Sequence, residues 1–396
     1  MQFTDFGKLK LSRLPSPCFV VDEVAVERNL RILNDVQTRS GAKVLHALKA
    51  FSMWSLAPLT NKYLSGTCSS GLHEAMLARE FYSGEIHVFS AAYSEADLKQ
   101  ILEFAHHVVF NSPSQLERFA HLCEPALKER DDLSIGLRVN PEHSEGEHEI
   151  YDPCAKGSRL GVTQAELERA LKKPEFQNAF RLVSGLHFHT LCEQDFLPLE
   201  RTLKAVEERF AAWLPQMQWL NCGGGHHITA PGYQIDALVD EIKSLRERYG
   251  FEVYLEPGEA VAIGTGVLVS EVLDIAFNYL PQAILDTSAT CHMPDTLEMP
   301  YRAHITDSGE PREKQFTYRL GGLTCLAGDV MGDYSFDDPL TVGQRLVFED
   351  MGHYTMVKTS TFNGTRLPSL AIWNSKTDAL QIVREFSYED FKGRLS

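Results

Sequence analysis

The sequence predicts an α/β protein in which a barrel of eight parallel strands is followed by a smaller, mainly β domain. Between residues 43 and 258, eight strand-like runs alternate with helix-like segments, which is the order of a (β/α)8 TIM barrel. After residue 258 the helical segments give way to short strand-like runs separated by turn residues, a pattern typical of a β domain or sandwich.

The eight strand-like runs of the first part are short, apolar and bounded by turn signals. They cover residues 43–50, 64–70, 85–90, 107–111, 133–140, 181–189, 219–225 and 252–258. A doubly wound sheet also alternates strand and helix, so it is the count of eight that favours the barrel.

The segments between these runs space their apolar residues three to four apart, as amphipathic helices do. Helices are expected over 94–105, 112–123, 163–173 and 233–250. Ser94, Ser112 and Thr163 precede three of them and are predicted N-caps, because their side-chain oxygens can accept a backbone N–H of the first turn.

The second part is predicted to contain strands over 267–277, 282–292, 315–323, 344–352, 369–375 and 379–386. Residues 16–23 also read as a strand, ahead of a helix over 24–37, and are expected to join the β domain. The predicted domains are therefore a barrel over 23–262 and a β domain made of 1–22 and 263–396.

Composition restricts the classes of partner and compartment. The chain of 396 residues has a formal net charge of −16, which disfavours nucleic acid and anionic membranes as partners and suits a small cationic ligand. Its eight cysteines form no C-x-x-C pair, a usage typical of a reducing compartment. Without a signal-peptide pattern or a run of roughly 18 apolar residues, a cytoplasmic location is expected.

Residues suited to chemistry stand at the C-terminal ends of four of the predicted barrel strands, where TIM barrels collect their functional groups. "VLHALKAFS" places a lysine directly after a buried strand. Such a lysine usually extends to water, so its meaning depends on the other strand ends. These supply, with Lys49, the residues His187, His189, Gly223, Gly224, Gly225 and Glu256.

Taken together, these groups match pyridoxal 5'-phosphate. Lys49 can form an imine with its aldehyde, and the backbone N–H groups of the glycine triplet can hold its phosphate. Glu256 can keep its ring nitrogen protonated, which makes the ring an electron sink. His189 can stack on the ring, and no metal is expected.

Six motifs in order resemble the fold-type III pyridoxal-phosphate decarboxylases, which include ornithine, diaminopimelate and carboxynorspermidine decarboxylases. They are "HALKA", "GLHFH", "NCGGG", "EPGEA", "GGLTCLAGD" and "DMGHYT", and the resemblance runs from about "SPCFVVDE" to the end of the chain. It implies an alanine-racemase-like barrel plus β domain, and a head-to-tail homodimer with active sites at the subunit interface.

The resemblance also implies roles for residues outside the barrel. Tyr354 resembles the phosphate-binding tyrosine, and Cys325 resembles the cysteine that reaches in from the other subunit and governs protonation of the carbanion. Asp329 would lie in the same intersubunit loop. Asp295 resembles the acid that holds the distal amine of ornithine-like substrates.

Departures from the common family pattern narrow the substrate. The usual H-x-G-S is here "HTLC", and the usual E-P-G-R ends in Glu259. The second change removes a cation near the phosphate and suits an amine rather than a second carboxylate. Leu326 follows Cys325, where diaminopimelate decarboxylases usually carry a glutamate.

The stretches "LDTSATCHMPDTLEMPYR", "FHTLCE" and "CLAGDVMGDY" are similar to carboxynorspermidine (carboxyspermidine) decarboxylases. The expected reaction is therefore decarboxylation of carboxynorspermidine, carboxyspermidine or both, giving norspermidine or spermidine. Asp295, Glu259 and Asp329 are the candidate ligands of the cationic tail. The motifs do not separate the two skeletons, because one methylene group changes none of them.

Three alternatives stay open at this point. The first is a diaminopimelate or ornithine-type decarboxylase. The second is a catalytically silent relative that binds a regulatory protein, which would be expected to lose Lys49, Cys325 or the acids. The third is a metal-dependent hydrolase with His187, His189, His226, His227 and acids as ligands. The acidic run over 142–153 is expected to be a solvated loop rather than part of the tail site.

Overall fold

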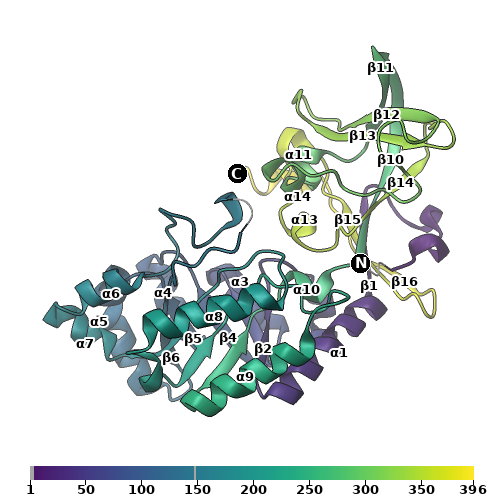
Figure 1. Cartoon of the computed structure of the whole chain (residues 1–396). Helices are drawn as coiled ribbons and strands as arrows, with labels where there is room; N and C mark the ends of the chain where they lie inside the picture. The colour runs from purple at the N-terminus through teal and green to yellow at the C-terminus, as the bar shows by residue number, and fades with distance from the viewer. Residues whose placement is uncertain (1–3, 147–148) are drawn as a thin grey trace. The chain divides into compact units, whose positions relative to one another are not determined.

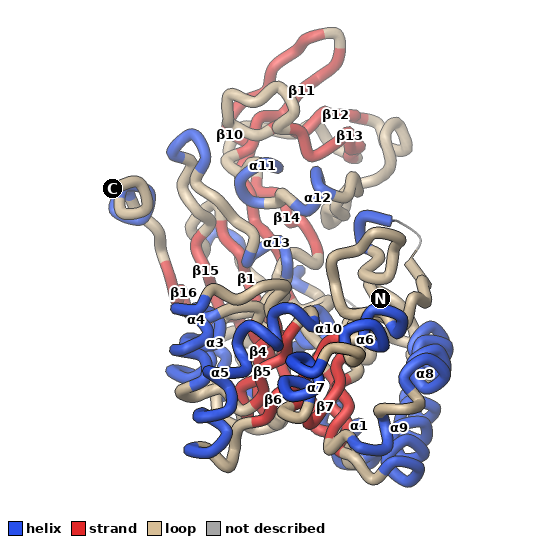
Figure 2. Tube along the Cα trace, turned by 90° about the vertical axis from the view of Figure 1, so that its left-hand side faces the viewer, coloured by secondary structure: helices blue, strands red, loops and turns tan. Residues whose placement is uncertain are grey.

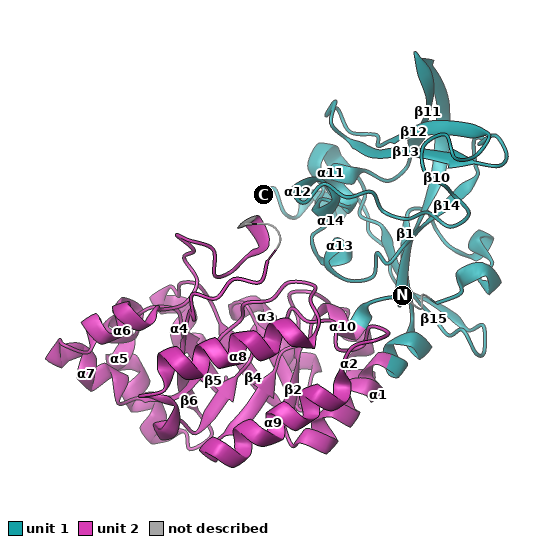
Figure 3. Cartoon of the chain, viewed as in Figure 1, with its two compact units in different colours: residues 1–28, 262–396 teal, residues 29–261 magenta. Residues whose placement is uncertain are grey.

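The computed structural model describes residues 4–146 and 149–396, and the chain divides into two compact units (Figure 3). One unit contains residues 29–261, and the other contains 1–28 and 262–396. Residues 1–3 of the expected β domain, and 147 and 148 of the acidic run, lie outside the described residues. None of the helices described is long and apolar enough to cross a membrane.

The first unit is a closed barrel of eight parallel strands, which confirms the predicted fold class (Figures 1 and 2). Each strand pairs with the next, and β9 pairs with β2 to close the ring. Their bounds are β2 (Lys43–Ala47), β3 (Gly66–Ser69), β4 (Glu85–Phe89), β5 (His107–Phe110), β6 (Ser134–Arg138), β7 (Val183–His187), β8 (Trp219–Asn221) and β9 (Glu252–Leu255). All eight predicted runs contain one of these strands, and each strand is shorter than the run predicted for it.

Helices surround the strands of this unit (Figure 2). Those of two turns or more are α1 (Glu23–Ser40), α3 (Leu72–Phe81), α4 (Glu95–Leu102), α5 (Pro113–Glu129), α8 (Phe196–Phe210) and α9 (Ile235–Tyr249), and shorter ones are α2 (Ala57–Thr60), α6 (Gln164–Ala170), α7 (Pro174–Phe180) and α10 (Glu259–Ala262). The predicted caps Ser94, Ser112 and Thr163 are confirmed, because each side chain accepts a backbone N–H three residues on.

Large side chains fill the middle of the barrel. Leu45, Val109, Trp219 and Tyr254 form one buried cluster. Gly185 makes room for it, because a Cβ there would lie 1.9 Å from the ring of Trp219. The barrel is therefore a packed core, and its chemistry is confined to its two ends.

The second unit is built on one mixed sheet with the order β13-β12-β11-β10-β1-β15-β16, and β14 pairs with β10. The bounds are β1 (Cys18–Asp22), β10 (Gly266–Asn278), β11 (Leu280–Leu285), β12 (Phe316–Gly321), β13 (Val330–Phe336), β14 (Arg345–Glu349), β15 (Ser369–Trp373) and β16 (Leu380–Arg384). The N-terminal strand β1 lies between β10 and β15.

Two sequence expectations for this unit were wrong in detail. The strand predicted over 282–292 ends at Leu285, and α11 (Ala289–His292) follows it, because the Ser288 side chain accepts the backbone N–H of Cys291 and caps a helix. Strand β13 was not predicted; its pairing with β12 gives an extended conformation to a stretch that contains Gly332. Three further short helices are α12 (Asp295–Glu298), α13 (Tyr354–Val357) and α14 (Tyr388–Lys392).

The described part of the acidic run is a loop, but it is not uniformly solvated. Glu145 accepts two hydrogen bonds of 2.7 Å from Arg201. Asp152 is buried and accepts the backbone N–H of Cys154 at 2.8 Å. These two acids therefore hold the loop in place, which corrects the expectation that the run is simply solvated.

Candidate active site

Lys49 stands in the turn that follows β2, at the C-terminal end of the barrel. The turn is anchored by the N–H of Leu48, which donates to the carbonyl of Cys68 on the next strand at 3.1 Å. The Lys49 side chain is exposed, yet its charge acts on buried groups at neighbouring strand ends, including Glu256 and His189. The ammonium group is thus accessible and part of one electrostatic cluster.

Glu256 directly follows β9, and its carboxylate is held by two neighbours. The Asn221 side-chain amide donates to Oε1 at 2.7 Å, and the His187 Nε2 lies 3.3 Å from Oε2. Burial by itself raises the pKa of Glu256, but His187, Asn221 and Lys49 lower it to about 2. Glu256 is therefore a buried carboxylate with a fixed orientation at neutral pH.

Asn221, at the end of β8, links this carboxylate to the glycine triplet. While its amide nitrogen donates to Glu256, its Oδ1 accepts the backbone N–H of Gly223 at 2.9 Å. One side chain thus fixes the position of both groups relative to each other.

His189 is oriented by the same glycine loop. Its Nδ1 accepts the backbone N–H of Gly224 at 3.1 Å, which leaves the proton of a neutral ring on Nε2. Burial, followed by the charges of Lys49 and Arg138, holds the pKa of His189 well below its usual value. The ring is therefore neutral and held by the backbone.

The glycine triplet is required by close backbone packing. A Cβ on Gly224 would lie 2.1 Å from the carbonyl oxygen of Glu256, and one on Gly225 would lie 1.9 Å from that of Leu191. Gly225 also has a φ of +84°, a conformation that glycine favours. The N–H groups of Gly225 and His226 donate to no residue within 4–146 or 149–396, so they remain available to an anion.

Arg138 and Cys68 belong to this cluster and were missed in the sequence. Arg138 ends β6, is 5% exposed, and donates to the carbonyl of His189 at 2.8 Å. Burial lowers the pKa of Arg138 to about 10, so it remains a cation. Burial, together with the charge of Glu256, raises the pKa of the Cys68 thiol. The signal available was position alone, since Arg138 ends an apolar strand much as Lys49 follows one.

Glu259, at the first residue of α10, lies against a histidine. Its Oε2 is 3.3 Å from the Nε2 of His227, and both side chains are largely buried, at 14% and 12% exposure. His226 in turn lies with Nδ1 2.6 Å from the hydroxyl of Tyr233. The four histidines of the hydrolase alternative therefore have other neighbours, and they form no ligand set of three in the part of the chain that the structure describes.

Two predicted residues of the second unit lie close together. Asp295 begins α12, and its Oδ2 accepts hydrogen bonds from the hydroxyls of Tyr301 at 2.7 Å and Thr355 at 2.8 Å. Thr355 is adjacent to Tyr354, which begins α13 and is half-buried. The Oδ1 of Asp295 is buried and has no hydrogen-bond partner among the residues described, so this carboxylate can accept one further donor.

Cys325 and Asp329 share one loop. The Cys325 thiol is free and exposed, and its backbone N–H donates to the Asn363 side chain at 3.2 Å. Asp329 is 3% exposed and accepts four hydrogen bonds, from Ser288, from the N–H of Thr290, and from both the N–H and the hydroxyl of Thr324. Those bonds fix the loop that carries Cys325. The substrate contact expected of Asp329 stays a prediction.

Comparison with known proteins identifies a family of pyridoxal-dependent enzymes. The family model described as "Pyridoxal-dependent decarboxylase, C-terminal sheet domain" matches residues 18–352. A carboxynorspermidine/carboxyspermidine decarboxylase of Campylobacter jejuni is 42% identical over 96% of this chain and 99% of its own length. A carboxyaminopropylagmatine decarboxylase of a Synechocystis species is 43% identical over 98% of this chain and 97% of its own.

The fold is shared as well. The crystal structure of carboxynorspermidine decarboxylase from Campylobacter jejuni, complexed with norspermidine, superimposes with a TM-score of 0.85 at 41% identity, covering 96% of this chain and 100% of that one. Diaminopimelate decarboxylases are only distant relatives. This chain belongs to the pyridoxal-dependent decarboxylase family, as a full-length relative of the carboxynorspermidine/carboxyspermidine decarboxylases.

Proposed function

We propose that this protein is a pyridoxal 5'-phosphate-dependent carboxy-lyase that converts carboxynorspermidine, carboxyspermidine or both to norspermidine or spermidine. The observation that carries the proposal is the cluster at the barrel end. There an accessible lysine helps to lower the pKa of a buried carboxylate, which His187 and Asn221 hold in place. The named relatives support the substrate class.

The residues at the barrel end fit this cofactor. Glu256 is an ionised, oriented acceptor for the ring nitrogen, and the uncommitted N–H groups of Gly225 and His226 suit a phosphate. Tyr354 would add a phosphate contact, and His189 would lie on the ring face. When bound, the cofactor supplies an electron sink for the pair left behind by carbon dioxide.

Three residues of the protein have proposed roles in the reaction. Lys49 would hold the cofactor through its ε-amine and could return a proton to the α-carbon of the substrate. Cys325, an exposed thiol, is the second candidate proton donor. Glu256 would keep the ring nitrogen protonated, because its pKa lies far below neutral pH and the carboxylate stays ionised.

Asp295 is proposed to bind the distal ammonium group of the substrate. Its Oδ1 is buried without a partner while Oδ2 is held by Tyr301 and Thr355. Such a carboxylate is oriented in advance and gains a charge-assisted hydrogen bond from an ammonium group. Glu259 and Asp329 are the further candidate acids for the tail, although the four donors that already contact Asp329 favour a supporting role for that residue.

A head-to-tail homodimer with shared sites is part of the proposal. The Cys325 loop is exposed and carries two exposed leucines, Leu323 at 45% and Leu326 at 46% exposure, as expected of a segment that a partner covers. Mixing the separately inactive Lys49→Ala and Cys325→Ala proteins should restore activity if each site combines both subunits, because a mixed dimer contains one intact site. Absence of restoration in verified mixed dimers would contradict shared sites.

Carboxyaminopropylagmatine is a second candidate substrate, favoured by the 43% identity to the Synechocystis enzyme. Its tail ends in a guanidinium group, whereas the tails of carboxynorspermidine and carboxyspermidine end in an ammonium group. Asp295 can bind either cation through Oδ1, the oxygen that has no partner among the described residues.

The function is tested by measuring carbon dioxide release from carboxynorspermidine, carboxyspermidine and carboxyaminopropylagmatine, with ornithine, lysine and diaminopimelate as comparison substrates. We expect turnover only of substrates from the first group. Lys49→Ala should remove both this turnover and the visible absorption of bound cofactor. Turnover of diaminopimelate or ornithine in preference, or full activity of Lys49→Ala, would refute the proposal. Arg39→Ala, on the surface of α1, is the control and should retain activity.

A further inference from the structure

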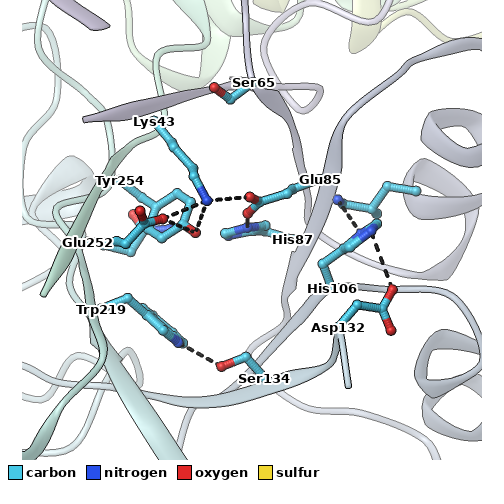
Figure 4. A network of polar contacts seen from close by, with 12 residues as sticks. Lys43, Ser65, Glu85, His87, His106, Asp132, Ser134, Trp219, Glu252 and Tyr254 are labelled. Atoms are coloured by element: carbon cyan, nitrogen blue, oxygen red, sulfur yellow. Dashed lines mark hydrogen bonds and ion pairs between the residues drawn. The ribbon is translucent and has the colours of Figure 1, made fainter. Parts of the chain in front are cut away.

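A second group of polar side chains lies at the opposite end of the barrel, where the strands begin. Lys43, Glu85 and Glu252 are the first residues of β2, β4 and β9. Figure 4 shows Lys43 between Glu85 and Glu252, with His87 at the second oxygen of the Glu85 carboxylate. None of these residues takes part in the chemistry proposed for the strand ends.

We propose that Glu85, His87 and His107 form a binding site for one divalent transition-metal ion, with Zn²⁺ as the best-suited ion. One oxygen or nitrogen atom from each of the three residues lies within 4.8 Å of the other two. The set of two imidazoles and one carboxylate is a known zinc ligand set, which leaves a fourth position for water.

Strand geometry brings the three ligands to one place. Glu85 and His87 are two residues apart on β4, so they point to the same side of the strand. His107 on β5 is the direct pairing partner of His87, and the two rings lie 3.8 Å apart. The Nε2 of His87 is 2.9 Å from the Glu85 carboxylate. The two imidazoles and the carboxylate therefore lie beside one another at the start of β4 and β5.

The histidines have spare coordinating capacity. His87 and His107 are 2% and 7% exposed, and the Nδ1 atoms of both are buried without a hydrogen-bond partner among the residues described. Unpaired buried nitrogen atoms are costly, and a metal ion would relieve that cost. Burial, aided by the positive charges nearby, also lowers the pKa of His107, so its ring is in the neutral form that metal ions bind.

The carboxylate is ionised and supported from behind. Burial opposes ionisation of Glu85, but hydrogen bonds with His87 and Lys43 lower its pKa below the usual range. The Lys43 ammonium lies 2.7 Å from the other oxygen of Glu85 and 2.5 Å from Glu252, which offsets its charge. A hydrogen-bonded second layer of this kind orients metal-binding carboxylates in proteins.

His107, one of the three proposed ligands, lines a cavity. This cavity of about 490 Å³ opens beside His107, Glu252 and Tyr254, and is also lined by Asp131 and Asp132. Acidic residues at its rim attract cations. A bound ion would join β4 to β5 at the end of the barrel where the strands begin. Lys49 and Glu256 lie at the opposite end, so the ion is expected to raise the stability of the folded protein.

The test uses the full-length, cofactor-loaded protein without a histidine tag, stripped of metal by a chelator. Calorimetric titration with Zn²⁺ should show one site per chain, and Mg²⁺, which disfavours imidazole ligands, should show none. His87→Gln and His107→Gln should each abolish this site. Lys43→Met should weaken it by roughly 10- to 100-fold, the effect expected of losing a second-layer partner.

His106→Gln is the matched control, because His106 is next in sequence but contacts Asp132 and the N–H of Ile86 instead. It should bind Zn²⁺ as the wild type does. Zinc X-ray absorption of the wild type needs no variant and should show two imidazole ligands and oxygen. The proposal would be overturned if the wild type failed to bind Zn²⁺, or if His87→Gln and His107→Gln bound it as tightly as the wild type. A sulfur ligand in the absorption spectrum would also overturn it.

Discussion

The carboxylate of Glu256 lies 3.3 Å from the imidazole of His187, and both side chains are almost completely buried. Burial lowers the pKa of His187, whereas Glu256 has a pKa of about 2. The pair thus presents a charged acceptor in a buried, preorganised site, where electrostatic interactions are stronger than in water.

Glu256→Gln should preserve the shape of this pair and remove its charge. We expect kcat for carboxypolyamine decarboxylation to fall by roughly 100-fold or more, equivalent to ~2.7 kcal/mol of transition-state stabilisation. Glu252→Gln, at the opposite end of β9, is the control and should leave kcat near the wild-type value. Equal losses in both variants would show that the effect comes from the strand and not from the site.

Asp295→Asn should weaken substrate binding more than chemistry. Loss of one charge-assisted hydrogen bond costs about 1.5–3 kcal/mol, which corresponds to a rise in KM of roughly 10- to 100-fold. Glu298→Gln provides the comparison, because Glu298 is exposed on the same short helix and pairs with Lys358. A fall in kcat with an unchanged KM would argue against a tail-binding role for Asp295.

Asp329→Asn distinguishes support of the Cys325 loop from direct substrate binding. The substituted amide would place a donor against some of the four donors that now contact Asp329. We expect a loss of about 1–3 kcal/mol of stability and a lower kcat, with KM little changed. Thermal unfolding and steady-state kinetics measure these quantities, and a raised KM with normal stability would favour the substrate contact instead.

Stability should decrease as the pH falls from about 7 to 5. Burial lowers the pKa of His46 to about 4 from 6.5, so between these values the unfolded chain binds a proton that the folded protein does not. The unfolded state is then favoured as pH decreases, by about 2 kcal/mol for this residue over that interval. His226 and His292 act in the same direction.

His46→Phe should reduce this pH dependence, since a phenyl ring takes up no proton and can pack against Phe51 and Tyr82 as the imidazole does. Unfolding midpoints at the two pH values, compared with those of His121→Gln at an exposed position, provide the measurement. An unchanged pH dependence in His46→Phe would show that other groups dominate.

Local patterns made much of the fold predictable. Alternating strand and helix signals identified all eight barrel strands and three helix caps, because burial of both faces and capping leave marks within a few residues. The errors in the predicted strands were in the second unit. There the length of β11 depends on a serine that caps a helix, and β13 depends on pairing with β12, so sequence periodicity was a weaker guide.

By itself the sequence determined the barrel, the lysine after β2, the glycine triplet and the acid after β9, because each belongs to a motif confined to one strand end. Only the tertiary structure decided which groups act on them. Asn221 joining Glu256 to Gly223, Arg138 beneath His189, Glu259 against His227, and the cluster of Glu85, His87 and His107 all combine different segments. Such contacts depend on strand register and closure of the ring, which bring together residues distant along the chain and which no local pattern encodes.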